Sequence, residues 1–317
     1  MNGLRDFVIF ILLLALAWYI WTNKQPTEHG KATEPVKVEE ETPQQKVSDK
    51  QFLLTYTYDM RFPDLETLEK AVLTIPVPQN SNSRQGISEL CFSHKNPQIV
   101  KSDDSKFAKI TLTNFAAQRT EVKMTMKANL HIYDYKRAVE LKQNYDRLDN
   151  KKRYLLPEKN IEVDSVTVKA AANNIKGQTP IEVLSSIVSY MQNNIEFGRV
   201  VSTIGAEKAL KNHLAGTSDY ANTFVALARA KGIPARVVSG YRIMGITARR
   251  HAWAEVYFQQ YGWVTFDPHN SPVDITDLNA YYIVSAYNSF TADSLETFYK
   301  GTSRSGKVIS DVDVKEL

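Results

Sequence analysis

The stretch from Ala215 to Asp267 constrains the fold more than any other part of this 317-residue chain. A predicted helix begins near Thr217 and ends at Lys231-Gly232, where glycine and a following proline stop helices. Three predicted strands follow, at Arg236–Tyr241, His251–Phe258 and Trp263–Asp267. A helix followed by closely connected strands predicts an α+β domain, with helices packed on an antiparallel sheet.

The last two of these strands also predict which side chains meet. Strand side chains alternate between two faces, so His251 and Asp267 share a face only if the hairpin loop has an odd number of residues. A loop of Gln259–Tyr261 would place Trp253 opposite Asp267. His251 would then be the diagonal neighbour of Asp267, about 7–8 Å away between backbones and within reach of a side-chain hydrogen bond.

Several motifs of this stretch occur together, in the order found in one known family. They are SDYANTFVALARA at 218–230, GIPARVVSGY at 232–241, HAWAEVY at 251–257 and GWVTFDP at 262–268. The region from about 155 to 290 therefore resembles the bacterial-type transglutaminase-like superfamily, which has a papain-like core. The resemblance implies a cysteine at the helix N-terminus that attacks an acyl group, with a histidine and an aspartate that activate it. Family members are transglutaminases, amidases or proteases, and some have lost activity.

The cysteine position of that family is occupied by Thr217. Asp219-Tyr220-Ala221 sets the register of the motif, and moving Ser218 to the cysteine position would rotate the apolar face of the helix by about 100°. An aliphatic alcohol is a weak replacement for a thiol, because a helix terminus and a neutral histidine do not bring its pKa into a useful range. Hydroxyl residues are preferred helix N-caps, so the sequence predicts a capping, non-nucleophilic role for Thr217.

The predicted site keeps the triad positions Thr217, His251 and Asp267. Each of the latter two also has a structural interpretation. His251 would be a half-buried strand histidine, and Asp267 a turn residue before Pro268. The predicted binding residues beside the triad are Trp253, Ser218 and Tyr241.

Composition excludes several other classes of site. Cys91 is the only cysteine, so a disulfide framework and a cysteine-based metal site are excluded, and its apolar neighbours predict that it is a buried packing residue. The six histidines show no zinc-ligand spacing, and no metal or other cofactor is predicted. With 39 basic and 35 acidic residues and no long basic run, the chain is not expected to bind nucleic acid.

The N-terminal residues 1–23 are predicted to be a membrane anchor. Phe7–Asn23 is uncharged, at the short end of the ~17–25 residues that span a bilayer, and its far end is rich in the aromatic residues favoured at membrane interfaces. The rival interpretation is a cleaved signal peptide, with its cleavage site near Ala15–Ala17. Residues 24–50 are polar and lack aromatic side chains, which predicts a disordered stalk. The body would then lie on the extracytoplasmic side of a single-pass membrane protein.

The remaining chain divides into two predicted regions. Residues 51–135 contain short alternating strands, such as Phe52–Tyr58, and predict a β-sandwich-like domain of the kind that often precedes this core. A charged connector at 136–153 leads to a transglutaminase-like domain at 154–317. There, Thr179-Pro180-Ile181-Glu182 predicts a helix start with a capping box, and Lys307–Val314 a final strand.

Three functions are open at this point. The leading interpretation is a membrane-anchored pseudoenzyme whose cleft binds a peptide, a glutamine-containing protein or a cell-wall peptide. An alternative is an active amide hydrolase or acyltransferase that uses Thr217, His251 and Asp267. The third is a structural scaffold at the membrane.

Overall fold

The computed structural model describes residues 46–81, 84–102, 104–133, 144–146, 148–198, 202–259, 261–269, 281–287 and 293–317. Gln44–Leu317 form one compact unit. The predicted anchor at 1–23 lies outside the described residues, and within them no helix is long and apolar enough to cross a bilayer. Of the predicted stalk, the last five positions are in fact strand, since Lys46–Lys50 begin the first β-strand.

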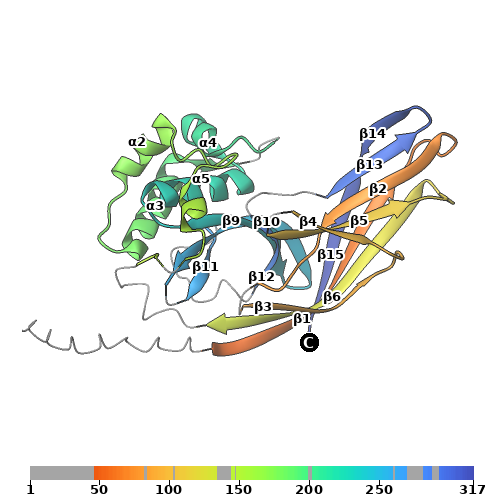
Figure 1. The fold of residues 1–317 in the computed structure, drawn as a ribbon, viewed down its shortest axis with the longest axis horizontal. Coiled ribbons are helices and arrows are strands. Elements are labelled where there is room, and N and C mark those ends of the chain that lie inside the picture. The colour runs from red at the N-terminus through yellow and green to blue at the C-terminus, as the bar shows by residue number, and fades with distance from the viewer. Residues whose placement is uncertain are drawn as a thin grey trace, which may run out of the picture. The chain divides into compact units, whose positions relative to one another are not determined.

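Most strands belong to two antiparallel sheets. The larger contains β1 (Lys46–Arg61), β3 (Gln85–Phe92), β6 (Arg119–Tyr133), β9 (Ala235–Met244), β10 (Thr247–Phe258), β11 (Gly262–Phe266), β12 (Tyr282–Tyr287) and β15 (Val308–Glu316). The smaller contains β2 (Leu68–Pro76), β4 (Gln98–Ser102), β5 (Ser105–Leu112), β13 (Ser294–Tyr299) and β14 (Thr302–Gly306). The strand orders are β12-β9-β10-β15-β1-β6-β3, with β11 on β10, and β14-β13-β2-β5-β4 (Figure 1).

The two sheets enclose one hydrophobic core. The alternation predicted for β1 is present, and Phe52, Leu54, Tyr56 and Tyr58 are all buried. They pack with side chains of β2, β5 and β6, which confirms a sandwich-like arrangement for the first region. Residues Tyr241, Ile243 and Ala248 of β9 and β10 join the same core, so the larger sheet runs without interruption into the second region.

The helices cover the other part of the larger sheet. They are the 3₁₀ helix η1 (Lys151–Leu155) and the α-helices α2 (Val166–Asn174), α3 (Pro180–Asn194), α4 (Ala206–Asn212) and α5 (Thr217–Ala230). The predicted capping box of α3 is confirmed, because Thr179 accepts from the backbone of Glu182 and the Glu182 carboxylate accepts from the backbone of Thr179. Helices α2 and α4 were not predicted from the sequence.

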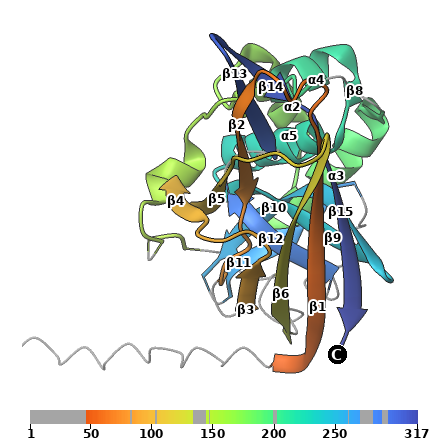
Figure 2. The ribbon, with the colours of Figure 1, turned by 90° about the vertical axis from the view of Figure 1, so that its right-hand side faces the viewer.

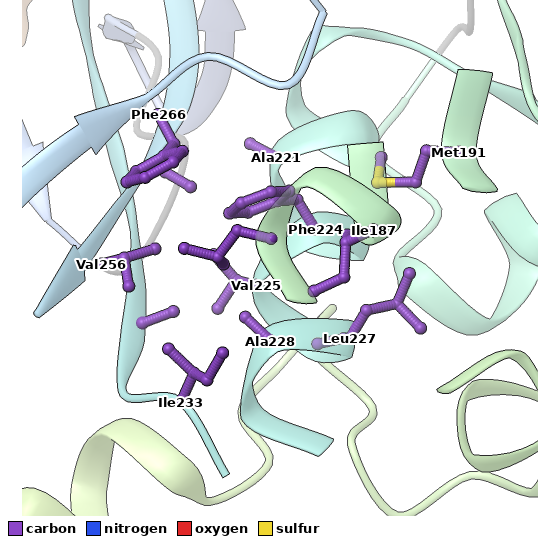
Figure 3. Packing of buried hydrophobic residues seen from close by; sticks show 14 of the residues in the cluster. Ile187, Met191, Ala221, Phe224, Val225, Leu227, Ala228, Ile233, Val256 and Phe266 are labelled. Atoms are coloured by element: carbon purple, nitrogen blue, oxygen red, sulfur yellow. The ribbon is translucent and has the colours of Figure 1, made fainter. Parts of the chain in front are cut away.

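Helix α5 is buried along most of its length. Figure 3 shows Phe224 and Val225 of α5 pointing toward Val256 of β10 and Phe266 of β11, in a core that also takes in side chains of α3. As predicted, the helix ends before Gly232, whose φ of 77° is left-handed. The α+β class is thus confirmed, with helices packed on an antiparallel sheet.

The C-terminal strands differ from the predicted organisation. The segment Lys307–Val314, assigned from sequence to the second region, forms β15 and pairs with β1, in a register from Phe52–Glu316 to Met60–Val308 (Figure 2). Strand β13 pairs with β2 in the same way. These late strands satisfy the backbone groups of strands at the start of the body, a long-range pairing that local patterns do not reveal.

Cys91 also differs from its prediction, because it is exposed. It lies on β3, the edge strand of the larger sheet, just after a bulge between Ser88 and Cys91. The bulge contains Glu89 at a positive φ of 52°. Apolar neighbours in sequence therefore did not predict burial, since a bulge interrupts the regular alternation of faces.

Candidate active site

The β10–β11 hairpin brings His251 and Asp267 together as predicted. Phe258 pairs with Gly262 and Ala254 with Phe266, so the loop has the expected odd length. The Nε2 of His251 lies 2.7 Å from Oδ2 of Asp267. Both residues are buried, which shields this bond from water. The diagonal geometry inferred from the sequence is confirmed.

Asp267 is held by two further donors. The Tyr282 hydroxyl of β12 donates to Oδ2 at 2.6 Å, and the backbone N–H of His269 donates to Oδ1 at 3.2 Å. Burial, and then the neighbouring Asp267 charge, raises the pKa of Tyr282 well above its usual range, so this hydroxyl keeps its proton as a donor. Tyr282 was not among the site residues predicted from the sequence, because only the pairing of β12 with β9 places it beside the hairpin.

Thr217 is the first residue of α5, but it does not cap the helix. The N-cap is Gly216, and no side chain caps this terminus. The predicted capping role for Thr217 is therefore wrong, because the helix begins one residue earlier than that role requires. Thr217 is half-buried and lines the same cleft as His251.

Asp219 links the start of α5 to the backbone of Ile204 and Gly205, just before α4. Its Oδ1 accepts backbone hydrogen bonds from Ile204 and Gly205, each at 2.9 Å. Burial raises the pKa of the Asp219 carboxyl, and hydrogen bonds from the backbone of Gly205, Ile204 and Gly216 partly oppose that shift. Asp219 is fully buried and away from the cleft lining, so it positions the helix terminus rather than contacting a ligand.

The cleft has a volume of about 170 Å³. Its lining residues among those described are Phe197, Thr217, Arg242, Met244, Arg249, Arg250, His251 and His269. The ring of Phe197 stacks on His269 with centroids 3.5 Å apart, and strand β7 (Glu196–Phe197), paired with β8 (Leu214–Ala215), holds Phe197 near the start of α5. The stack supplies an apolar wall beside Thr217 that the sequence analysis did not predict.

Similarity to known proteins agrees with this geometry. Residues 169–268 match the model of the transglutaminase-like superfamily. The structure superposes on that of a proposed cysteine protease from Cytophaga hutchinsonii with a TM-score of 0.65 and 17% identity, over 86% of this chain and 92% of that one. The fold is transglutaminase-like.

Two other similarities are more distant. The uncharacterized protein YebA of Bacillus subtilis is 24% identical over 169 residues, which cover 46% of this chain and only 22% of YebA. The periplasmic domain of TgpA from Pseudomonas aeruginosa aligns with a TM-score of 0.36 and 14% identity, over 72% of this chain and 93% of that domain.

The residues predicted to bind a ligand, Trp253, Tyr241 and Ser218, are not among the described residues that line the cleft. Trp253 is fully buried and packs against Tyr282, with centroids 5.0 Å apart. Tyr241 is buried in the sandwich core, where its ring meets Tyr56 edge-on. Neither is among the described residues that line the cleft. Ser218 is half-buried beside Thr217 and is not among the described lining residues.

A metal site is not apparent in the described part of the chain. Within those residues, no group of three or more His, Cys, Asp or Glu side chains is arranged to hold an ion. Two of the buried polar side chains at the centre of the domain, His251 and Asp267, are instead bonded to each other. The chemistry available to the cleft is that of one hydroxyl, two imidazoles and three guanidinium groups among the described residues.

Proposed function

We propose that the chain is a membrane-anchored, extracytoplasmic transglutaminase-like protein whose cleft binds an amide-bearing peptide group without turning it over. The observation that carries this proposal is that Thr217 lines the same cleft as His251, whose imidazole is bonded to Asp267. By the motif Ser218–Ala230, Thr217 stands where the family's thiol is expected, and in the structure it is the first residue of α5. The uncharged run Phe7–Asn23 supports the membrane anchor.

The absence of turnover follows from the chemistry of position 217. A helix N-terminus and a histidine stabilise a thiolate, but the alkoxide of threonine is far more basic than either group can compensate. The γ-methyl group of Thr217 also restricts the rotamers from which its hydroxyl could attack. Since Nε2 of His251 is bonded to Asp267, proton exchange with a cleft ligand would fall to Nδ1.

Binding is supported by the remaining lining of the cleft. The hydroxyl of Thr217 is not used as a helix cap, so it is available to hydrogen-bond a ligand amide. The Phe197–His269 stack offers an apolar surface beside it. A peptide segment with a glutamine side chain, from a protein or from the cell wall, has the required amide and a short apolar stem.

The test is restoration of the thiol. Thr217→Cys should release ammonia from glutamine peptides in the presence of an amine, whereas the natural chain should not exceed background. Cys91→Ser should be present in every protein assayed, because Cys91 is an exposed thiol. Adding His251→Ala to Thr217→Cys should abolish turnover, which would show that the activity belongs to this cleft. If Thr217→Cys is folded but neither turns over nor binds any glutamine peptide, the proposal fails.

A second candidate function is an active hydrolase or acyltransferase with Thr217 as nucleophile. It is favoured by one observation, namely that the Thr217 side chain faces the cleft rather than capping α5. The same assay separates the two candidates. Turnover by the natural chain that disappears in Thr217→Ala and in His251→Ala would establish the enzyme and contradict the inactive binding cleft.

A further inference from the structure

We propose that Arg242 and Arg249 form an anion-binding end of the cleft, and that the ligand carries a carboxylate close to the amide held at His251. This inference rests on the proposed binding function of the cleft and identifies the class of ligand. The ligand would be an acidic peptide in which a glutamate, an aspartate or a chain-terminal carboxylate is one or two residues from the bound amide.

The register of β9 and β10 places the two arginines directly opposite each other. Arg242 pairs with Arg249, and the next position on the same face pairs Gly240 with His251. Strands rise about 3.3 Å per residue, so the arginine pair lies roughly 7 Å along the ladder from His251. Both arginines line the cleft together with His251 and Thr217.

Two like charges in direct cross-strand opposition destabilise a sheet. Arg242 is half-buried and Arg249 is exposed, and neither forms an ion pair with another residue in the described part of the chain. Their neighbour Arg250 differs, because its guanidinium pairs with Asp293. No acidic side chain is among the described residues that line the cleft. The two guanidinium groups therefore repel each other, and a bound anion would relieve that repulsion.

A second arginine pair in the same sheet shows how repulsion between opposed arginines can be compensated. Arg61 of β1 lies opposite Arg119 of β6. There Arg119 is bonded to Asp59 at 2.9 Å and to Glu121 at 3.2 Å. Carboxylates of the protein itself supply the compensation at that site. At the cleft the corresponding partner has to come from a ligand.

The chemistry of the site favours a carboxylate. Guanidinium groups bind carboxylates through paired, charge-assisted hydrogen bonds, which fix both position and orientation. Consecutive Cα atoms of a peptide are about 3.8 Å apart. An extended peptide with its amide at His251 would therefore place a carboxylate of its next or next-but-one residue at the arginine pair. Met244 follows on β9 and gives the cleft an apolar wall beyond them.

The experiment measures peptide binding to the full chain, purified in a mild detergent, by isothermal calorimetry. The probes are acetyl-Ala-Gln-Glu-Ala-amide, its neutral counterpart acetyl-Ala-Gln-Gln-Ala-amide, and acetyl-Ala-Gln-Ala with a free terminal carboxylate. We expect the first to bind about tenfold more tightly than the neutral peptide. The preference should shrink as salt is raised to about 0.5 M, because the site is open to solvent. Tighter binding of the third peptide would support the inference with a chain terminus as the source of the carboxylate.

Variants separate this inference from the proposed function. In Arg242→Gln/Arg249→Gln the affinity for the glutamate peptide should fall to that for the neutral peptide. Arg61→Gln, with the same loss of charge outside the cleft, should keep the preference. Equal affinity of the natural chain for the acidic and neutral peptides would overturn the inference and leave the binding function standing, as would a preference that survives in the double variant. If no peptide binds to the folded natural chain, both are overturned.

Discussion

At one end of the ladder between β9 and β10, Arg236 lies opposite Glu255, and at the other end Arg242 lies opposite Arg249. All four side chains are on the same face of the sheet, with His251 between the two ends. The first pair is buried and charge-matched, whereas the second is open and carries two like charges. On this face, the residue opposite an arginine therefore decides whether that arginine has a structural partner or is available to a ligand.

At the closed end of the ladder, meaning the Arg236–Glu255 pair, both charges have partners within the protein. Arg236 donates to Oε2 of Glu255 from both Nε, at 2.8 Å, and Nη2, at 2.6 Å. Its guanidinium also lies over the rings of Tyr287, at 3.9 Å, and Trp263, at 4.2 Å. A buried pair with this many contacts is difficult to separate, since either partner alone would be a buried, uncompensated charge.

The largest expected effect comes from breaking the closed end. Glu255→Gln should lower the free energy of unfolding by about 3–5 kcal/mol, because it leaves the Arg236 charge buried without its partner. Chemical denaturation of the full chain measures this. Glu296→Gln, an exposed change of the same kind on β13, should alter stability by no more than about 0.5 kcal/mol. A loss below about 1 kcal/mol for Glu255→Gln would mean that the two ends do not differ as described.

At the open end of the ladder, meaning the Arg242–Arg249 pair, loss of one charge should have the opposite effect on stability. Arg249→Gln should raise the free energy of unfolding by about 0.2–1 kcal/mol, because it removes a like-charge pair from the ladder. The gain should be larger at low ionic strength, where repulsion is less screened. Arg61→Gln serves as the comparison, since its cross-strand neighbour Arg119 is already paired with carboxylates. A clear loss of stability in Arg249→Gln would show that Arg249 has a structural partner.

The smallest effect concerns protonation of His269, which lines the same cleft as Arg242 and Arg249. Burial lowers the pKa of His269 below its usual 6.5, and the neighbouring His251 and Arg242 side chains add to this, while Asp267 opposes it. Because the unfolded chain then binds the proton more readily, the natural protein should lose stability as the pH falls from 6.5 toward the folded pKa. His269→Gln should lose less stability over that interval in urea titrations. An identical pH dependence in the two proteins would remove His269 from this account.

Local patterns accounted for a large part of the site. The odd loop length of the β10–β11 hairpin was sufficient to put His251 beside Asp267, because side-chain alternation is a property of each strand alone. The capping box of α3 was likewise readable, since its bonds join residues three positions apart. The start of α5 was placed closely enough to locate Thr217 but not to define its role. A difference of one residue at a helix end changes a cap into a first-turn residue.

Local patterns along the chain were therefore sufficient for the α+β class, the hairpin register and the meeting of His251 with Asp267. The contact of Tyr282 with Asp267, the burial of Trp253 and the place of Arg242 and Arg249 at the cleft became visible only in the folded chain. The difference lies in the range of the interactions. Periodicity and capping act within an element, whereas burial and cross-strand partners depend on which strands become neighbours. In this sheet those neighbours include β1 and β15, which come from the two ends of the sequence of the compact unit.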